Sequence, residues 1–320
     1  MSPSLLTIPP ELRQLIYEQL FNRITIQHGF GTTSPGDRTA ILLTCKTLHS
    51  EASKMLPRHA LFRFRGTEDM LNTLTCVAHS VLTQIRRMEV GAFPYPLYPG
   101  RLDFYHSYHF SNSLSLLPGL KLDCLKVIDC FHAYGMGEQW RDCATYFDFE
   151  SLLLSDGWKV LEYRTTTAFM RSLHDQRKRR KVQPDNWRDL LSERDGGEQS
   201  NADVHMFIQP YNTQLYLPWS AAPGHMVAAN PTTATPGQKL DGNVTIKAKR
   251  ETSDYAVKGL PTGKCWSDLK AGDLEIYGWE PYYHNWADAV GWMYGGYARR
   301  SDMAFQALVN HQRLLPTSTS

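Results

Sequence analysis

The sequence predicts an α/β fold with parallel strands, in which an N-terminal α+β module precedes a longer α/β domain. The composition is typical of a globular protein, with 42% hydrophobic and 21% charged residues. Helical and strand-like patterns alternate in the N-terminal module, residues 1–66. In the following domain, residues 67–315, apolar segments recur at a nearly constant spacing, which indicates repeated strand–helix units.

The first predicted helix covers residues 9–21. Pro10 suits its first turn, where the missing N–H has no helical partner, and Glu11 suits the positive end of the helix dipole. Four apolar residues follow the spacing of one helix face: Leu12, Leu15, Ile16 and Leu20. This segment is therefore expected to be an amphipathic helix.

A second helix is predicted over residues 39–56, where apolar residues repeat at helical spacing and Pro57 provides a stop signal. Two short strands accompany it. Residues 23–27 alternate β-branched with polar side chains, and residues 61–65 alternate phenylalanine with arginine. Together these elements predict a helix–strand–helix–strand module.

Three later segments share the pattern apolar-x-x-apolar-x-apolar. They begin at Ile85, Leu122 and Trp158, which are 37 and then 36 residues apart, and each follows a helical stretch. This period is typical of a leucine-rich-like stack, in which each unit buries its apolar face against the next. An ordinary α/β sheet with crossover helices gives the same signal. Both architectures predict parallel strands in the core.

The pattern changes after Arg171. The basic run 177–181, RKRRK, has the form of a nuclear-import signal, and a solvated loop of the same composition is an equal expectation. The remaining predicted elements are strands at 204–209 and 244–249, helices at 286–292 and 302–314, and a disordered tail at 316–320.

Charge and hydropathy exclude several classes of function. The net charge is +2, whereas a protein that neutralises nucleic-acid phosphates needs a clear basic surplus. We expect neither a signal peptide nor a membrane span, because the first residues lack a basic region followed by an apolar one and no apolar window approaches eighteen residues. The cysteines lack a C-x-x-C pair, which indicates reduced thiols in the cytoplasm, the nucleus or both. They are Cys45, Cys76, Cys124, Cys130, Cys143 and Cys265.

The sequence contains no recognisable catalytic, cofactor or metal motif. Residues 259–265, GLPTGKC, lack both the spacing and the Ser or Thr of a phosphate-binding loop. The patterns G-x-S-x-G and H-E-x-x-H are also absent. We therefore expect a non-enzymatic protein that carries no cofactor and no metal.

Tyrosine and tryptophan are concentrated in residues 277–297. These residue types are frequent at binding hot spots, because they bury a large area and keep a polar tip. They also suit the closed end of a repeat stack, so both roles remain open. The candidate partner-binding residues are Tyr277, Trp279, Tyr282, Tyr283, Trp286 and Trp292.

Three N-terminal segments carry a resemblance to a known family. They are the opening Ile8-Pro9-Pro10-Glu11-Leu12 with its continuation RQLIYEQLF, the helix ILLTCKTLHSEASKML, and the Phe62-x-Phe64 strand. The matching residues within them include Arg13, Tyr17, Leu43 and Glu51. The module resembles the divergent F-box found in filamentous fungi. Later segments, to about residue 210, resemble the irregular repeats that follow such boxes.

This resemblance implies that the module docks on the small adaptor subunit of an SCF-type ubiquitin ligase, while the C-terminal domain selects an unknown substrate protein. The implied docking residues are Pro9, Leu12, Leu15, Ile16, Leu42, Cys45 and Leu48. An ordinary F-box consists of three helices, whereas this module has a strand and a glycine-rich loop between its helices. An amphipathic stripe can either pack in the core of the module or bind a partner. Exposed side chains of Leu15 and Leu48 would favour partner binding, and buried ones would favour a role in the core.

The alternative is an F-box-like scaffold or binding module outside any ligase, in which residues 277–297 recognise the partner. Exposed rings in a groove favour this role, and buried rings favour a capping role.

Overall fold

The computed structural model describes residues 5–29, 37–92, 95–97, 106–108, 110–129, 149–166, 186–195, 197, 200–210, 217–219 and 242–271. Within these residues, eight strands form one sheet in the order β1-β2-β3-β6-β7-β10-β8-β9. Their bounds are β1 Thr25–His28, β2 Leu61–Phe64, β3 Arg87–Ala92, β6 Leu122–Asp129, β7 Trp158–Thr166, β10 Gly242–Lys249, β8 Asp203–Pro210 and β9 Leu217–Trp219. A separate hairpin pairs β4 (Tyr95–Leu97) with β5 (His106–Tyr108). The predicted α/β class is confirmed.

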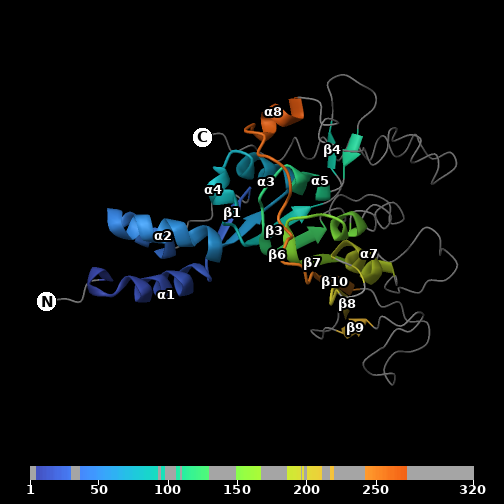
Figure 1. Ribbon diagram of the computed structural model, residues 1–320, viewed down its shortest axis with the longest axis horizontal. Helices are drawn as coiled ribbons and strands as arrows, with labels where there is room; N and C mark the ends of the chain where they lie inside the picture. Colours follow the sequence, from blue (N-terminus) through green and yellow to red (C-terminus); the bar gives the residue numbers. More distant parts are fainter. Residues whose placement is uncertain are drawn as a thin grey trace.

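The helices form two groups (Figure 1). Helices α1 (Pro10–Phe21) and α2 (Lys46–His59) project together beyond the β1 edge of the sheet. The others are α3 Thr67–Leu74, α4 His79–Leu82, α5 Phe110–Ser115, α7 Asn186–Asp195 and α8 Trp266–Ala271. Two 3₁₀ helices, η1 (Leu5–Thr7) and η2 (Asp37–Leu43), precede α1 and α2.

The second predicted helix is divided in the structure. The segment 37–43 is η2, and α2 begins only after Cys45, whose extended backbone (φ −160°, ψ 164°) separates the two. The prediction that Pro57 stops the helix is wrong, because α2 continues to His59. Pro57 lies in the last turn, which is closed by a hydrogen bond from the Ala60 N–H to the Leu56 carbonyl. Proline has no N–H to donate to the carbonyl of the residue four positions earlier, so the helix loses one hydrogen bond there and ends within a turn.

The three recurrent apolar segments lie side by side on parallel strands. Leu122 pairs with Trp158, and Leu125 pairs with both Met88 and Leu161. The strands β1, β2, β3, β6 and β7 are parallel and follow one another in chain order, as the repeat spacing predicts. After β7 the pattern changes, because β10 runs antiparallel to β7 and β8 runs antiparallel to β10.

Two hydrophobic cores lie on either side of β2. The larger core covers one face of the sheet and includes the fully buried Trp158, Leu161 and Tyr163. The smaller core lies between α1, α2 and the first strands, and contains Tyr17, Phe21, Ile24, Leu48, Ala52 and Ala60. Phe62 packs against both cores. The sheet is continuous across residue 66, because β2 pairs with β3.

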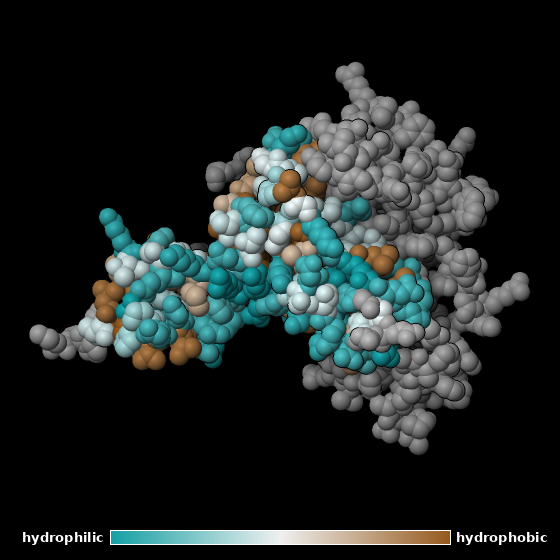
Figure 2. Space-filling view, in the orientation of Figure 1, coloured by the Kyte–Doolittle hydropathy of each residue, from teal (hydrophilic) through white to brown (hydrophobic). Residues whose placement is uncertain are grey.

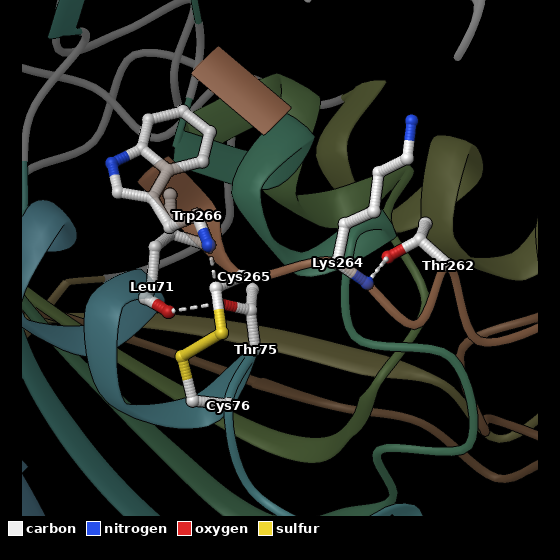
Figure 3. The surroundings of a disulfide bond; sticks show 7 residues. All are labelled: Leu71, Thr75, Cys76, Thr262, Lys264, Cys265 and Trp266. Atoms are coloured by element: carbon white, nitrogen blue, oxygen red, sulfur yellow. Dashed lines mark hydrogen bonds between the residues drawn. A yellow bond between two sulfur atoms is a disulfide. The ribbon is translucent and has the colours of Figure 1, made fainter. Parts of the chain in front are cut away.

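A disulfide joins Cys76, after α3, to Cys265, before α8, across 189 residues of sequence (Figure 3). Their Cα atoms are 5.1 Å apart, within the range that a disulfide spans. Beside them, the backbone N–H of Trp266 donates a hydrogen bond to the Thr75 hydroxyl at 2.8 Å. The expectation of reduced thiols is wrong for this pair. Cys45 and Cys124 are free, and Cys130 and Cys143 lie outside the described residues.

Candidate docking surface

Helix α1 exposes three of the four apolar residues that its sequence periodicity placed on one face, and the fourth, Leu20, packs against the smaller core. The exposed fractions of Leu12, Leu15 and Ile16 are 51%, 56% and 40%. The buried residues of α1 are Arg13, Tyr17 and Phe21, which lie at four-residue intervals on another face. We call Leu12, Leu15 and Ile16 the α1 strip. Figure 2 shows hydrophobic surface along the edge of the projecting helix pair where α1 lies.

A polar clamp holds the other face of α1 against α2. The Arg13 guanidinium donates from Nε to Oε2 of Glu51 at 2.8 Å and from Nη2 to Oε1 at 2.6 Å. Its Nη1 donates to the Ile8 carbonyl at 2.6 Å, which fixes the chain entering α1. The Tyr17 hydroxyl donates to Oε2 of Glu51 at 3.0 Å. Such two-pronged pairing fixes geometry, because both guanidinium prongs must meet the carboxylate.

The clamp perturbs the titration of all three of its side chains. Hydrogen bonding from Arg13 lowers the pKa of Glu51, and the carboxylate of Glu51 in turn raises the pKa of Arg13. Burial raises the pKa of Tyr17, and its hydrogen bond to Glu51 adds to this effect. Glu51 is therefore ionised at neutral pH and pairs with the Arg13 guanidinium.

The seven implied docking residues separate into three groups. Pro9, Leu12, Leu15 and Ile16 are exposed, and Leu42 and Cys45 are partly buried against the smaller core. Leu48 is only 6% exposed and belongs to that core. Leu48 therefore supports the surface from beneath and cannot form part of it, because its side chain is covered by the packing of α1 on α2.

Two further exposed leucines were not assigned a docking role from the sequence. Leu6 is 49% exposed and precedes α1, and Leu43 is 87% exposed and precedes α2. Both helices lead into the sheet at their C-terminal ends, so both begin at the projecting end (Figure 1). Leu43 was already part of the family pattern, and this match was the signal that could have identified it.

The described residues contain no cluster of three or more His, Cys, Asp or Glu side chains suited to a metal ion. No helix among them combines the length and apolar character that crossing a membrane requires. The predicted aromatic segment 277–297 and the basic run 177–181 lie outside the described residues, as do the predicted helices 286–292 and 302–314 and the tail 316–320.

Comparison with known proteins found no matching protein family, no matching curated protein and no matching solved structure.

Proposed function

We propose that this chain is a non-enzymatic interaction protein that acts as the substrate-recognition (F-box) subunit of an SCF-type ubiquitin ligase. The observation that supports the proposal is the α1 strip, whose three apolar side chains are exposed on a helix held in place from its opposite face. An exposed apolar helix face is a common docking element, because a partner groove can remove it from water.

The strand between the two helices raised the question of whether the module satisfies its own apolar stripes. In the structure, β1 pairs with β2 and contributes to the smaller core, while the α1 strip stays exposed. The inserted strand therefore leaves this apolar surface uncovered. Arg13, Tyr17 and Phe21, together with Leu20, attach α1 to the rest of the module.

The mechanism in this proposal is proximity. The α1 strip holds the ligase adaptor, and the domain formed by residues 67–315 holds an unknown substrate protein. No residue of the chain performs a chemical step, and the proposal includes no cofactor, no nucleic acid and no membrane. Such a ligase subunit acts in the cytoplasm or the nucleus, and imaging of a fluorescent fusion tests this location.

A direct titration with the purified SCF adaptor tests the proposal. Wild-type protein should bind, and the double variant Leu12→Asp with Ile16→Asp should bind at least about 100-fold more weakly, because two carboxylates would be buried without partners. Leu260→Asp is the matched control, because Leu260 is 87% exposed and lies far along the chain, before α8.

Circular dichroism should show that both variant proteins remain folded. The proposal fails if wild-type protein shows no adaptor binding, or if Leu260→Asp weakens binding as much as the double variant. In that case the alternative of a binding module outside any ligase is favoured, and deletion of residues 277–297 followed by partner capture tests that role.

A further inference from the structure

The sheet has an outer face, opposite the larger core, that no described helix covers. In β3, Met88, Val90 and Ala92 are buried, whereas Arg87 and Glu89 on the other side are partly exposed. In β10 and β8, Lys247, Lys249 and His205 on the outer side are exposed, whereas Thr245 on that side is buried. Helices α3, α4 and α5 lie together on one side of the strands (Figure 1). Parallel strands are usually covered on both faces, so a face without a helix among the described residues is a candidate surface for a partner.

The outer face carries a row of charges whose sign alternates from strand to strand. Register pairs Arg63 with Glu89 and Glu89 with Lys126. It then pairs Lys126 with Glu162 and Glu162 with Lys247. Each glutamate therefore lies between two basic residues, an arrangement in which neighbouring strands attract one another.

The outer face has an excess of positive charge. The strands place six basic residues on it, Arg63, Arg87, Lys126, Arg164, Lys247 and Lys249, against three acidic ones, Glu89, Glu162 and Asp203. An excess of +3 on one face exceeds the net charge of +2 of the whole chain.

Each acidic residue of this face is already paired. The Arg63 Nε lies 2.7 Å from Oε1 of Glu89, and the Arg164 Nη2 lies 2.5 Å from Oε1 of Glu162. Asp203 pairs with His205 at 2.5 Å. The lysines Lys247 and Lys249 are exposed, and Lys126 is partly exposed.

Two other acids of β6 do not weaken this charge. Asp123, near the start of the strand, accepts a hydrogen bond from the Tyr255 hydroxyl at 3.0 Å. Asp129 accepts one from the Thr165 hydroxyl at 2.7 Å, on the side of the sheet that carries the core. The Asp129 carboxylate therefore lies on the core side, and the Asp123 carboxylate is engaged by Tyr255.

Apolar side chains accompany these charges. Beside the charged row, register aligns Leu61 with Arg87, Arg87 with Cys124, and Cys124 with Val160. Phe207 lies on the same face, with Lys247 Nζ 5.5 Å from its ring centre. This mixture suits a partner that carries both carboxylates and apolar side chains.

We infer that the outer face of the sheet binds an acidic segment of a partner protein. Carboxylates of the segment contact Lys126, Lys247 and Lys249, and its apolar side chains lie on Val160 and its neighbours. A nucleic-acid strand fits less well, because Glu89 and Glu162 interrupt the basic residues and would repel a continuous row of phosphates. This surface shares no residue with the α1 strip, so it stands independently of adaptor docking.

A binding assay with a fluorescent peptide of alternating glutamate and leucine tests the inference at low ionic strength. Wild-type full-length protein should bind the peptide, and added salt should weaken binding, because the lysines are exposed to screening. The triple variant Lys126→Glu, Lys247→Glu and Lys249→Glu should bind at least about tenfold more weakly. The triple variant with glutamine at the same positions should also lose affinity, by a smaller factor.

The matched control reverses three exposed lysines elsewhere, Lys54, Lys258 and Lys264, and so changes the net charge equally. It should retain the affinity for the peptide. A gain-of-affinity variant is Glu162→Gln, which removes the carboxylate between Lys126 and Lys247 and should tighten binding several-fold.

Three results would overturn the inference: no binding of the peptide by wild-type protein, equal weakening in the control, or tighter binding of a single-stranded oligonucleotide than of the peptide. The triple variant should still bind the SCF adaptor if the proposed function holds. A failure of adaptor docking therefore remains distinguishable from a failure of this surface.

Discussion

Leu15 and Leu48 provide a matched pair for testing which face of the N-terminal helices is buried. Both are leucines within helices of the same module, and each is changed to alanine. Leu15, in α1, is 56% exposed, whereas Leu48, in α2, is 6% exposed and lies in the smaller core. The two substitutions remove the same atoms, so the exposed fraction accounts for the expected difference.

The magnitude follows from the buried carbon atoms. Each buried methylene contributes about 0.8 kcal/mol, so removing three carbons at a fully buried leucine costs about 2.4 kcal/mol, and a residual cavity increases this. We expect Leu48→Ala to cost about 2.5 to 4 kcal/mol. Leu15→Ala should cost less than about 1 kcal/mol, because most of its side chain already contacts water and no cavity forms.

Hydrogen exchange followed by mass spectrometry measures the loss of stability locally, because the exchange rates of the α1 and α2 amides report the free energy of local opening. A loss of about 2.5 kcal/mol corresponds to roughly 60-fold faster exchange, so Leu48→Ala should exchange at least about 60-fold faster, against less than about fivefold for Leu15→Ala. In the adaptor titration the order should reverse, with Leu15→Ala the weaker binder. Equal acceleration of exchange in both variants would place Leu15 in the core and refute the docking surface.

Three further predictions concern the clamp, the disulfide and a turn. Because Arg13 lowers the pKa of Glu51, the clamp stabilises the module above the ordinary carboxyl pKa. This stabilisation is lost as the pH falls through the lowered pKa of Glu51. When hydrogen exchange of the α1 amides is measured at decreasing pH, the loss of protection should therefore be steeper in wild type than in Arg13→Gln. Cys265→Ser should lower the free energy of unfolding, measured by urea denaturation, by about 2 to 5 kcal/mol, because the disulfide closes a long loop. The control Cys124→Ser should leave this free energy nearly unchanged, since Cys124 is free. Gly157→Ala should lower the melting temperature, because Gly157 has φ +102° and an added Cβ would lie 2.8 Å from Cγ2 of Val257. An unchanged melting temperature would contradict this prediction.

The parallel strands β3, β6 and β7 could be predicted from sequence because their apolar pattern recurs along the chain. The recurring template leaves two residues between its first two apolar positions, and the structure explains this gap in β6. The N–H groups of Asp123 and Cys124 both donate to the carbonyl of Arg86, an irregularity that shifts the alternation. Leu122 and Leu125 are therefore both buried although they are three residues apart. A repeated irregularity of this kind is visible in a sequence.

The buried face of α1 could not be predicted, because it depends on a residue far along the chain. Periodicity alone favours burial of the leucines and exposure of Arg13. Glu51, 38 residues away, supplies the partner that makes burial of Arg13 favourable, and Tyr17 completes the hydrogen bonding. The disulfide between Cys76 and Cys265 could not be predicted for the same reason. The two cysteines are 189 residues apart in sequence, and they meet only because α8 packs beside α3.

The two surfaces are joined by the sheet itself. Helix α2 leads into β2, whose four residues pair with β1 on one side and with β3 on the other. Arg63 in this strand begins the charged row of the outer face, while its neighbour Phe62 packs against both cores. Because backbone hydrogen bonds on both sides of β2 resist twisting and sliding, a partner on the α1 strip and a partner on the outer face would be held in a fixed relation. In the proposed function this connection replaces a flexible linker, and a glycine-rich insertion after Gly66 should therefore leave substrate modification nearly unchanged, because β2 stays paired with β3.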